Sequence, residues 1–130
     1  MELRLNICVP VAGPLGLLTA LEALVSINRV YLRTHPRAPS LYRAGLRYLR
    51  DVDNRSQALP DAELWLTIPD TIAAGGADCK VLSAYRVAEL REGGELDARC
   101  HVVQVGPSSW HVVVKRADGT TEDPSRRLGM

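Results

Sequence analysis

The stretch that decides the fold is Gly75–Arg91, which reads GGADCKVLSAYRVAELR. Asp78 is a good N-cap residue, so we expect a helix whose first residue is Cys79. Apolar side chains then recur at helical spacing, and Gly93 with Gly94 supplies a stop signal at the far end. The stretch therefore predicts a central helix that begins with a cysteine.

Two β-rich runs follow this helix, Asp97–Val105 (DARCHVVQV) and Trp110–Lys115 (WHVVVK). The segment Gly106–Ser109 between them is typical of a turn, so the two runs predict a β-hairpin. A second tight turn at Asp118–Gly119 leads to a third expected strand, Thr120–Asp123, which the following proline ends. The C-terminal third of the chain is therefore expected to form a small antiparallel sheet.

The N-terminal half is less regular. Leu3–Val9 alternates weakly and predicts a short strand, whereas apolar residues after Pro14 recur at helical spacing to about Arg33. The first half of that helix is apolar almost all round, so we expect it to lie in the core. Leu41–Arg50 (LYRAGLRYLR) fits either a strand or a short helix, and the polar segment Asp51–Asp61 is expected to be a loop. The fold class is α+β, with N-terminal helices packed on the C-terminal sheet.

Length and composition limit the classes of protein to which this chain can belong. The chain has 130 residues, which suits one domain over 1–130, and 46% hydrophobic with 24% charged residues is an ordinary globular composition. The net charge of +1 creates no global field that would favour nucleic acid or an anionic membrane. The longest uncharged stretch, Leu5–Leu21, is broken by prolines and glycines and is shorter than the ~20 apolar residues of a membrane span. Three cysteines fit reduced thiols in a cytoplasm, so we expect a cytoplasmic protein.

Cys79 is the candidate nucleophile. Unpaired backbone N–H groups and the helix dipole stabilise a thiolate at a helix N-terminus, and the same N–H groups can face an oxyanion. The negative charge of Asp78 acts against the thiolate. Taken alone, Cys79 is better explained as a small buried core residue.

His111 and Asp123 are the candidate base and orienting carboxylate. They lie on strands expected to be adjacent, and a histidine held by a carboxylate can take the proton of a thiol. A two-residue turn at 118–119 would place Val114 opposite Asp123, so we expect His111 to meet Asp123 only if a bulge or a longer loop intervenes.

These residues carry a resemblance to a known superfamily. Cys79 in GGADCKVLSAYRVAELR, His111 in WHVVV and Asp123 in the ending DGTTEDPS resemble the core of the transglutaminase-like (papain-like) cysteine enzymes. The resemblance covers roughly residues 60–130, and the tail DPSRRLGM is similar to small members encoded by phages and prophages. It implies a papain-like α+β core and a Cys79–His111–Asp123 catalytic triad.

The resemblance also implies acyl transfer through a thioester, either hydrolysing an amide or peptide or cross-linking glutamine to lysine. The implied partner is a protein or peptide substrate, in a bacterial host cell or associated with a virion, with no nucleic acid, membrane, cofactor or metal. Candidate oxyanion donors are the Cys79 backbone N–H and the indole of Trp65, for which core packing is the alternative. A catalytically inactive scaffold or binding protein of a phage particle is the second function class.

The remaining candidates have simpler interpretations. Cys100 and His101 are neighbours on an expected strand and face opposite sides, and their spacing is poor for zinc. Cys8 lies in an apolar run and is expected to be in the core. Arg126 and Arg127 could contact an acidic substrate group or belong to a flexible tail.

Overall fold

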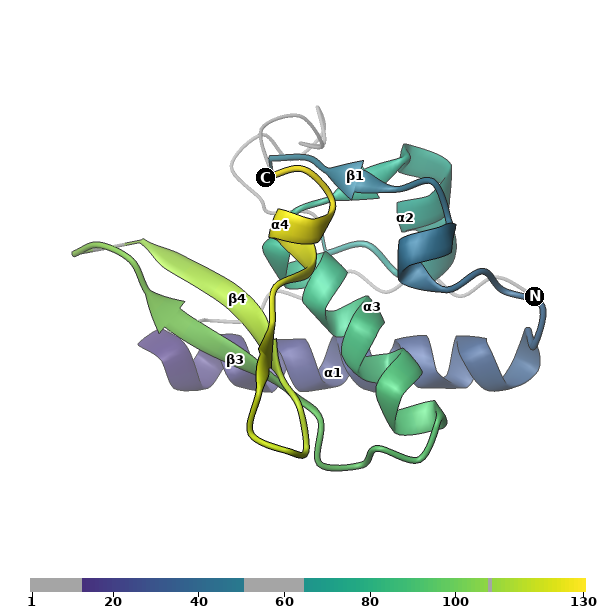
Figure 1. The fold of residues 1–130 in the computed structure, drawn as a ribbon, viewed down its shortest axis with the longest axis horizontal. Coiled ribbons are helices and arrows are strands. Elements are labelled where there is room, and N and C mark those ends of the chain that lie inside the picture. The colour runs from purple at the N-terminus through teal and green to yellow at the C-terminus, as the bar shows by residue number, and fades with distance from the viewer. Residues whose placement is uncertain (1–12, 51–64, 108) are drawn as a thin grey trace.

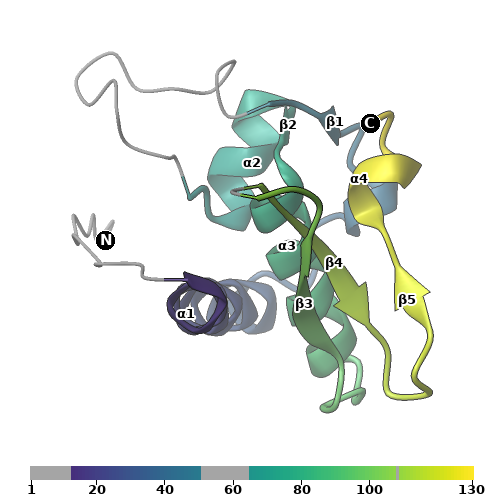
Figure 2. The same cartoon turned by 90° about the vertical axis from the view of Figure 1, so that its left-hand side faces the viewer.

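Two helices cover one face of a three-stranded antiparallel sheet in the computed structural model, which describes residues 13–50, 65–107 and 109–130 (Figures 1 and 2). The expected α+β class is therefore confirmed, and the predicted strand at 3–9 and the predicted loop at 51–61 both lie outside the described residues. In chain order the elements are α1 Gly13–Thr34, the 3-10 helix η1 Leu41–Arg43, β1 Arg47–Tyr48, α2 Ile68–Ala74, β2 Gly76–Ala77, α3 Cys79–Glu92, β3 Arg99–Gln104, β4 Trp110–Lys115, β5 Thr121–Glu122 and α4 Pro124–Arg127.

Helix α3 is the centre of the core, and its two ends lie where the sequence predicts them. It begins at Cys79, and the Asp78 carboxylate caps it by accepting a hydrogen bond from the Val81 N–H at 3.3 Å. Gly93 is the C-cap, as expected. Other elements pack against nearly every side of the first ten residues of α3, and most of these residues are apolar or small. The buried residues of the helix are Lys80, Val81, Leu82, Ser83, Ala84, Tyr85, Val87 and Ala88.

Helix α1 is confirmed, but the expectation that its first half lies in the core is wrong. Its buried residues, Leu21, Leu24, Val25 and Asn28, lie in the middle, and Leu15 is 77% exposed. The reason is that α1 crosses α3 near its own middle, so the first two turns extend beyond the helix that would cover them (Figure 1).

By length and composition, α1 is apolar enough to cross a membrane, which is weak evidence because core helices and signal sequences share this property. Polar contacts tie it to the rest of the fold. Glu22 pairs with Arg91 at 2.8 Å, and Arg29 pairs with Glu92 at 2.6 Å. The fully buried Asn28 side chain accepts a hydrogen bond from the Ile68 N–H at 3.1 Å. This packing is compatible with a soluble protein.

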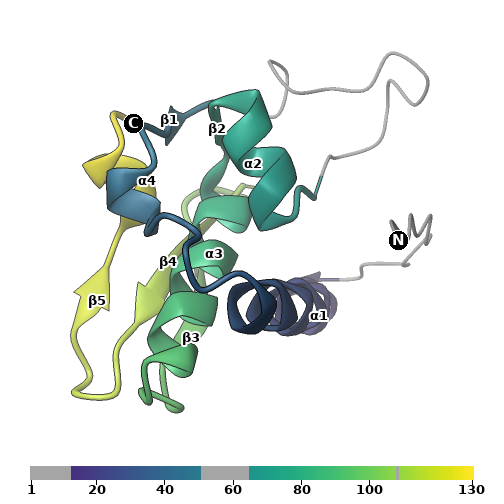
Figure 3. The same cartoon turned by 90° about the vertical axis from the view of Figure 1, so that its right-hand side faces the viewer.

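Two short helices and a second pair of strands go beyond the predictions. The segment 41–50 combines both alternatives, because η1 is one turn of helix and β1 pairs in parallel with β2. Helix α2 begins just before Pro69, a residue suited to a first helical turn, and it lies with β1 and β2 near the N-terminal end of α3 (Figure 3). A Cβ on Gly76 would lie 2.0 Å from the Arg47 carbonyl oxygen. Gly76 is therefore needed for the approach of β1.

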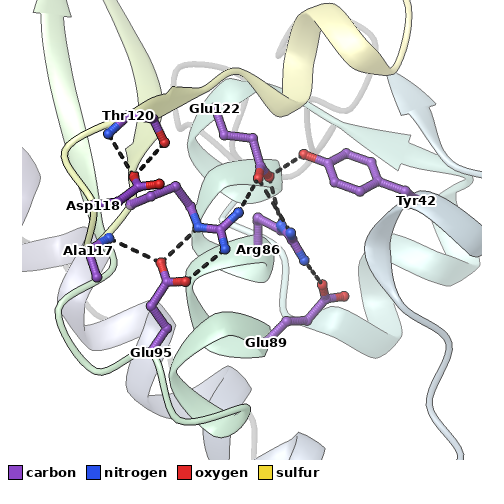
Figure 4. A network of polar contacts seen from close by, with 9 residues as sticks. Tyr42, Arg86, Glu89, Glu95, Ala117, Asp118, Thr120 and Glu122 are labelled. Carbon is purple, nitrogen blue, oxygen red and sulfur yellow. Dashed lines mark hydrogen bonds and ion pairs between the residues drawn. The ribbon is translucent and has the colours of Figure 1, made fainter.

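The carboxylate of Glu122 connects β5 to the rest of the molecule (Figure 4). It accepts hydrogen bonds from the Tyr42 hydroxyl at 2.5 Å, from Arg86 Nε at 2.6 Å and from Arg116 Nη1 at 3.2 Å. Arg86 also pairs with Glu89, whose other oxygen accepts the Leu41 N–H. Burial alone would raise the pKa of Glu122, but the hydrogen bonds from Arg86 and Tyr42 outweigh it and hold the pKa below its usual range.

We predict that Glu122→Gln reduces the acid sensitivity of folding. A carboxylate with a lowered pKa stabilises the fold above its unfolded pKa of about 4.3, and this contribution is lost as the pH falls through the lower folded pKa. Urea unfolding between pH 6 and pH 3 should therefore give a shallower pH dependence for the variant than for the natural chain. Glu95→Gln is the control, because Glu95 pairs with Arg116 nearer the surface and should change the slope less. Equal slopes for Glu122→Gln and the natural chain would contradict the assignment.

Candidate active site

The structure brings His111 and Asp123 into hydrogen-bond contact. His111 lies on β4, Asp123 directly follows β5, and His111 Nε2 is 2.9 Å from Asp123 Oδ2. The two side chains are 18% and 20% exposed, so the pair is shielded from water but still reachable. This is the geometry that a carboxylate needs to orient an imidazole ring.

Of the two expected ways for His111 to meet Asp123, a bulge or a longer loop, the structure has the longer loop. The Arg116 N–H donates to the Thr120 carbonyl at 2.9 Å, which leaves a three-residue loop that ends at Gly119, with a φ of 87°. Val114 therefore pairs with Glu122 and not with Asp123. This shift of one residue puts His111 and Asp123 on the same face of the sheet, where diagonal neighbours can touch.

Asp123 has a second contact besides His111. Its Oδ1 accepts a hydrogen bond from the Arg126 N–H at 3.3 Å and so caps α4, while Oδ2 faces His111. The Arg126 Nε lies 3.6 Å from the same Oδ2. The two oxygens of one carboxylate therefore serve the helix cap and the histidine separately.

Cys79 is the first residue of α3 and is half-buried against the hydrophobic core. One turn later on the same helix face, the Ser83 hydroxyl donates to the Val112 carbonyl at 3.1 Å. Val112 directly follows His111, so this bond fixes the N-terminal part of α3 beside the start of β4. Ser83 was not among the candidate residues, because its role depends on a contact between segments distant in sequence.

The Val112 carbonyl is accessible to α3 because β5 leaves part of β4 unpaired. Alternate residues of β4 direct their backbone groups toward β5, as Arg116 does in its bond to Thr120, and Val112 has the same parity. The β4–β5 ladder covers only Val114 and Lys115. Beyond it the chain turns into α4, which packs against α3. The open edge of β4 therefore faces the N-terminal part of the helix.

No protein-family model, curated protein or solved structure matches this chain. The site is therefore interpreted from its own geometry and chemistry.

The other predicted residues take varied positions. Trp65 is half-buried and packs against the hydrophobic core, so its role as an oxyanion donor remains a prediction. Arg127 is part of α4, and its guanidinium lies 3.8 Å from the Tyr42 ring centroid, which shows that the tail is ordered and corrects the alternative of a flexible end. Arg126 is exposed at the rim of the site.

Cys100, the other described cysteine, does not form a metal site with the described histidine and acidic residues. Cys100 is buried against the helices, and His101 faces the other side of β3, as expected. Among the described residues there is no group of three or more histidine, cysteine or acidic side chains that could hold a metal ion. Cys8 lies outside the described residues.

We predict that Cys100 is unreactive in the folded protein. Burial raises the pKa of the Cys100 thiol to about 12, so almost no thiolate exists near neutral pH. Iodoacetamide at pH 8, followed by mass spectrometry of the peptides, should modify Cys100 only after unfolding in urea. Rapid modification of Cys100 in the native protein would show that β3 opens readily or is not buried.

Proposed function

We propose that this chain is a cysteine-dependent acyl-transfer enzyme with a papain-like core. Cys79 would be the nucleophile, His111 the general base and Asp123 the orienting carboxylate. The observation that carries the proposal is the partly buried hydrogen bond of 2.9 Å between His111 Nε2 and Asp123 Oδ2. The order of the three residues along a helix, a strand and the end of the next strand agrees with the transglutaminase-like superfamily that the sequence resembles.

The tautomer of His111 follows from its contact with Asp123. An ionised carboxylate can only accept a hydrogen bond, so Nε2 donates to Asp123 and the neutral ring carries its hydrogen on Nε2, which leaves the lone pair on Nδ1. Nδ1 is then the atom that would accept the Cys79 thiol proton. The imidazolium that forms is stabilised by the negative charge of Asp123.

The reaction would proceed in two halves. The Cys79 thiolate attacks the carbonyl carbon of an amide, and the Cys79 backbone N–H at the start of α3 can donate to the oxyanion. The tetrahedral intermediate collapses to a thioester when His111 returns the proton to the departing amine. In the second half, His111 takes a proton from water or from a lysine amine, which attacks the thioester, and the proton then returns to the Cys79 sulfur.

Access of Cys79 to His111 is supported by the open edge of β4. Cys79 lies one helical turn, about 5 Å along the axis, from Ser83, whose hydroxyl bonds beside His111. Asp123 lies toward the same edge, because it follows β5 where the ladder ends. The nucleophile, base and carboxylate would therefore meet where β5 departs from β4.

The substrate class follows from the chemistry and from the resemblance. A protein or peptide amide is the expected substrate, and water or lysine as the acceptor decides between hydrolysis and cross-linking. We include in the proposal a cytoplasmic location in a bacterial host and association with a phage particle, both taken from the resemblance. No cofactor is needed for any step.

We predict that Cys79 reacts with iodoacetamide at pH 7 much faster than Cys100, and that His111→Ala removes this advantage. The reason is that a histidine partner stabilises the thiolate. Peptide mass spectrometry over a time course measures each rate, and a melting curve checks that the variant is folded. Cys79→Ala should leave the fold intact and abolish acyl transfer. Slow labelling of Cys79 in the natural chain would instead support the inactive scaffold.

We predict that Asp123→Asn keeps the fold and lowers the rate of acyl transfer by about 10²–10⁴-fold. Asparagine still caps α4, but it cannot stabilise the imidazolium and can select the wrong tautomer. Asp123→Ala is the matched variant, because it removes both the cap and the charge and should cost about 1 kcal/mol of additional stability. Rates are compared after correction for the folded fraction from melting curves. A fully active Asp123→Asn would remove Asp123 from the triad.

A further inference from the structure

The two chain neighbours of the candidate nucleophile form a buried ion pair. Lys80 Nζ pairs with Asp78 Oδ2, and these two residues are the immediate neighbours of Cys79 in the chain. Asp78 is 5% exposed and Lys80 is 8% exposed, which is unusual for charged residues. The other oxygen of Asp78 caps α3 through the Val81 N–H.

This pair resolves a conflict in the sequence. A carboxylate next to a cysteine disfavours the thiolate, because two negative charges repel each other. The effect is strong in a buried site, where the local dielectric constant is low. The ammonium group of Lys80 offsets that charge while leaving the carboxylate available as the helix cap.

We propose that Lys80 is a positioning residue that neutralises Asp78 and thereby keeps the Cys79 thiol ready to ionise. The inference rests on the proposed function, because it assigns a role to the charge environment of the same nucleophile. Lys80 does not touch the substrate in this role. It acts through Asp78 on the charge that Cys79 experiences.

The other described charged groups near α3 fall into three sets along the helix. At its C-terminal end, Glu22, Arg29 and Arg33 of α1 pair with Arg91 and Glu92, far from Cys79. Farther along the helix, Arg86 and Glu89 join Glu122 and Tyr42. At the N-terminal end, the described charged and titratable groups on elements that pack against α3 include His111 of β4 and Arg126 and Arg127 of α4, and Asp123 precedes α4. The variants below leave all of these unchanged, so a shift reports on the Asp78–Lys80 pair.

The charge that each variant removes determines the direction in which the midpoint of Cys79 alkylation shifts. Lys80→Met removes the ammonium group that pairs with Asp78, so the midpoint of Cys79 alkylation against pH should rise by about one unit. Asp78→Asn keeps a good helix cap and leaves the Lys80 charge, so the midpoint should fall by a similar amount. The double variant Asp78→Asn with Lys80→Met carries neither charge and should return close to the natural midpoint.

The experiment measures iodoacetamide alkylation of Cys79 in the full chain from pH 5 to pH 10, by peptide mass spectrometry. Lys115→Met is the matched control, because Lys115 is the only other lysine and lies at the far end of β4 from His111. It should leave the midpoint unchanged. Melting curves establish that each variant is folded at the temperature of the assay.

The result that supports the proposal is a pair of opposite shifts that cancel in the double variant. A purely structural ion pair would lower stability in both single variants without moving the midpoint, and this would overturn the proposal. If Lys80→Met does not fold, Asp78→Asn decides alone, and an unchanged midpoint overturns the proposal. Slow alkylation of Cys79 in the natural chain would instead refute the proposed function, which keeps the two failures distinct.

Discussion

The carboxylate of Glu122 fixes the C-terminal strand to the buried helix, and the geometry of the site depends on it. Strand β5 has only two residues, so its ladder with β4 is too short to hold it firmly. Hydrogen-bond donors from Tyr42, Arg86 and Arg116 hold β5 in place in addition to the ladder, since they come from three separate segments. A buried carboxylate with several charge-assisted hydrogen bonds is directional, whereas apolar packing alone would let the strand slide.

The position of Asp123 follows from that anchor. It is the next residue after Glu122, and it takes the two contacts that end β5, one to α4 and one to His111. Because the chain leaves the sheet at this point, no other described strand pairs with the β4 edge near His111. The Ser83 hydroxyl satisfies the Val112 carbonyl that this departure leaves unpaired. The short strand, the open edge and the approach of α3 are therefore consequences of one another.

Ion pairs lie at both ends of α3, and they differ in burial. At the C-terminal end, exposed or half-exposed pairs join α3 to α1 and contribute modestly. At the N-terminal end, Asp78 and Lys80 form a buried pair, which has a large desolvation cost. A buried pair is a weak means of adding stability, so its place beside a candidate nucleophile is better explained by the charge that it controls.

Local signals in the sequence determined the elements whose determinants are contiguous. Asp78 and Gly93 set the ends of α3 because caps act on neighbouring backbone groups, and the hairpin of β3 and β4 follows from β-rich runs on both sides of a glycine–proline turn. The same signals named Cys79, His111 and Asp123, whose functional role remains a prediction. Tertiary structure decided the rest, for reasons of packing. The three-residue loop at Gly119 set the register that joins His111 to Asp123, and the length of α3 left the first turns of α1 uncovered. The pairing of Lys80 with Asp78 depends on the burial of both side chains, and burial is a property of the assembled fold and not of the local sequence.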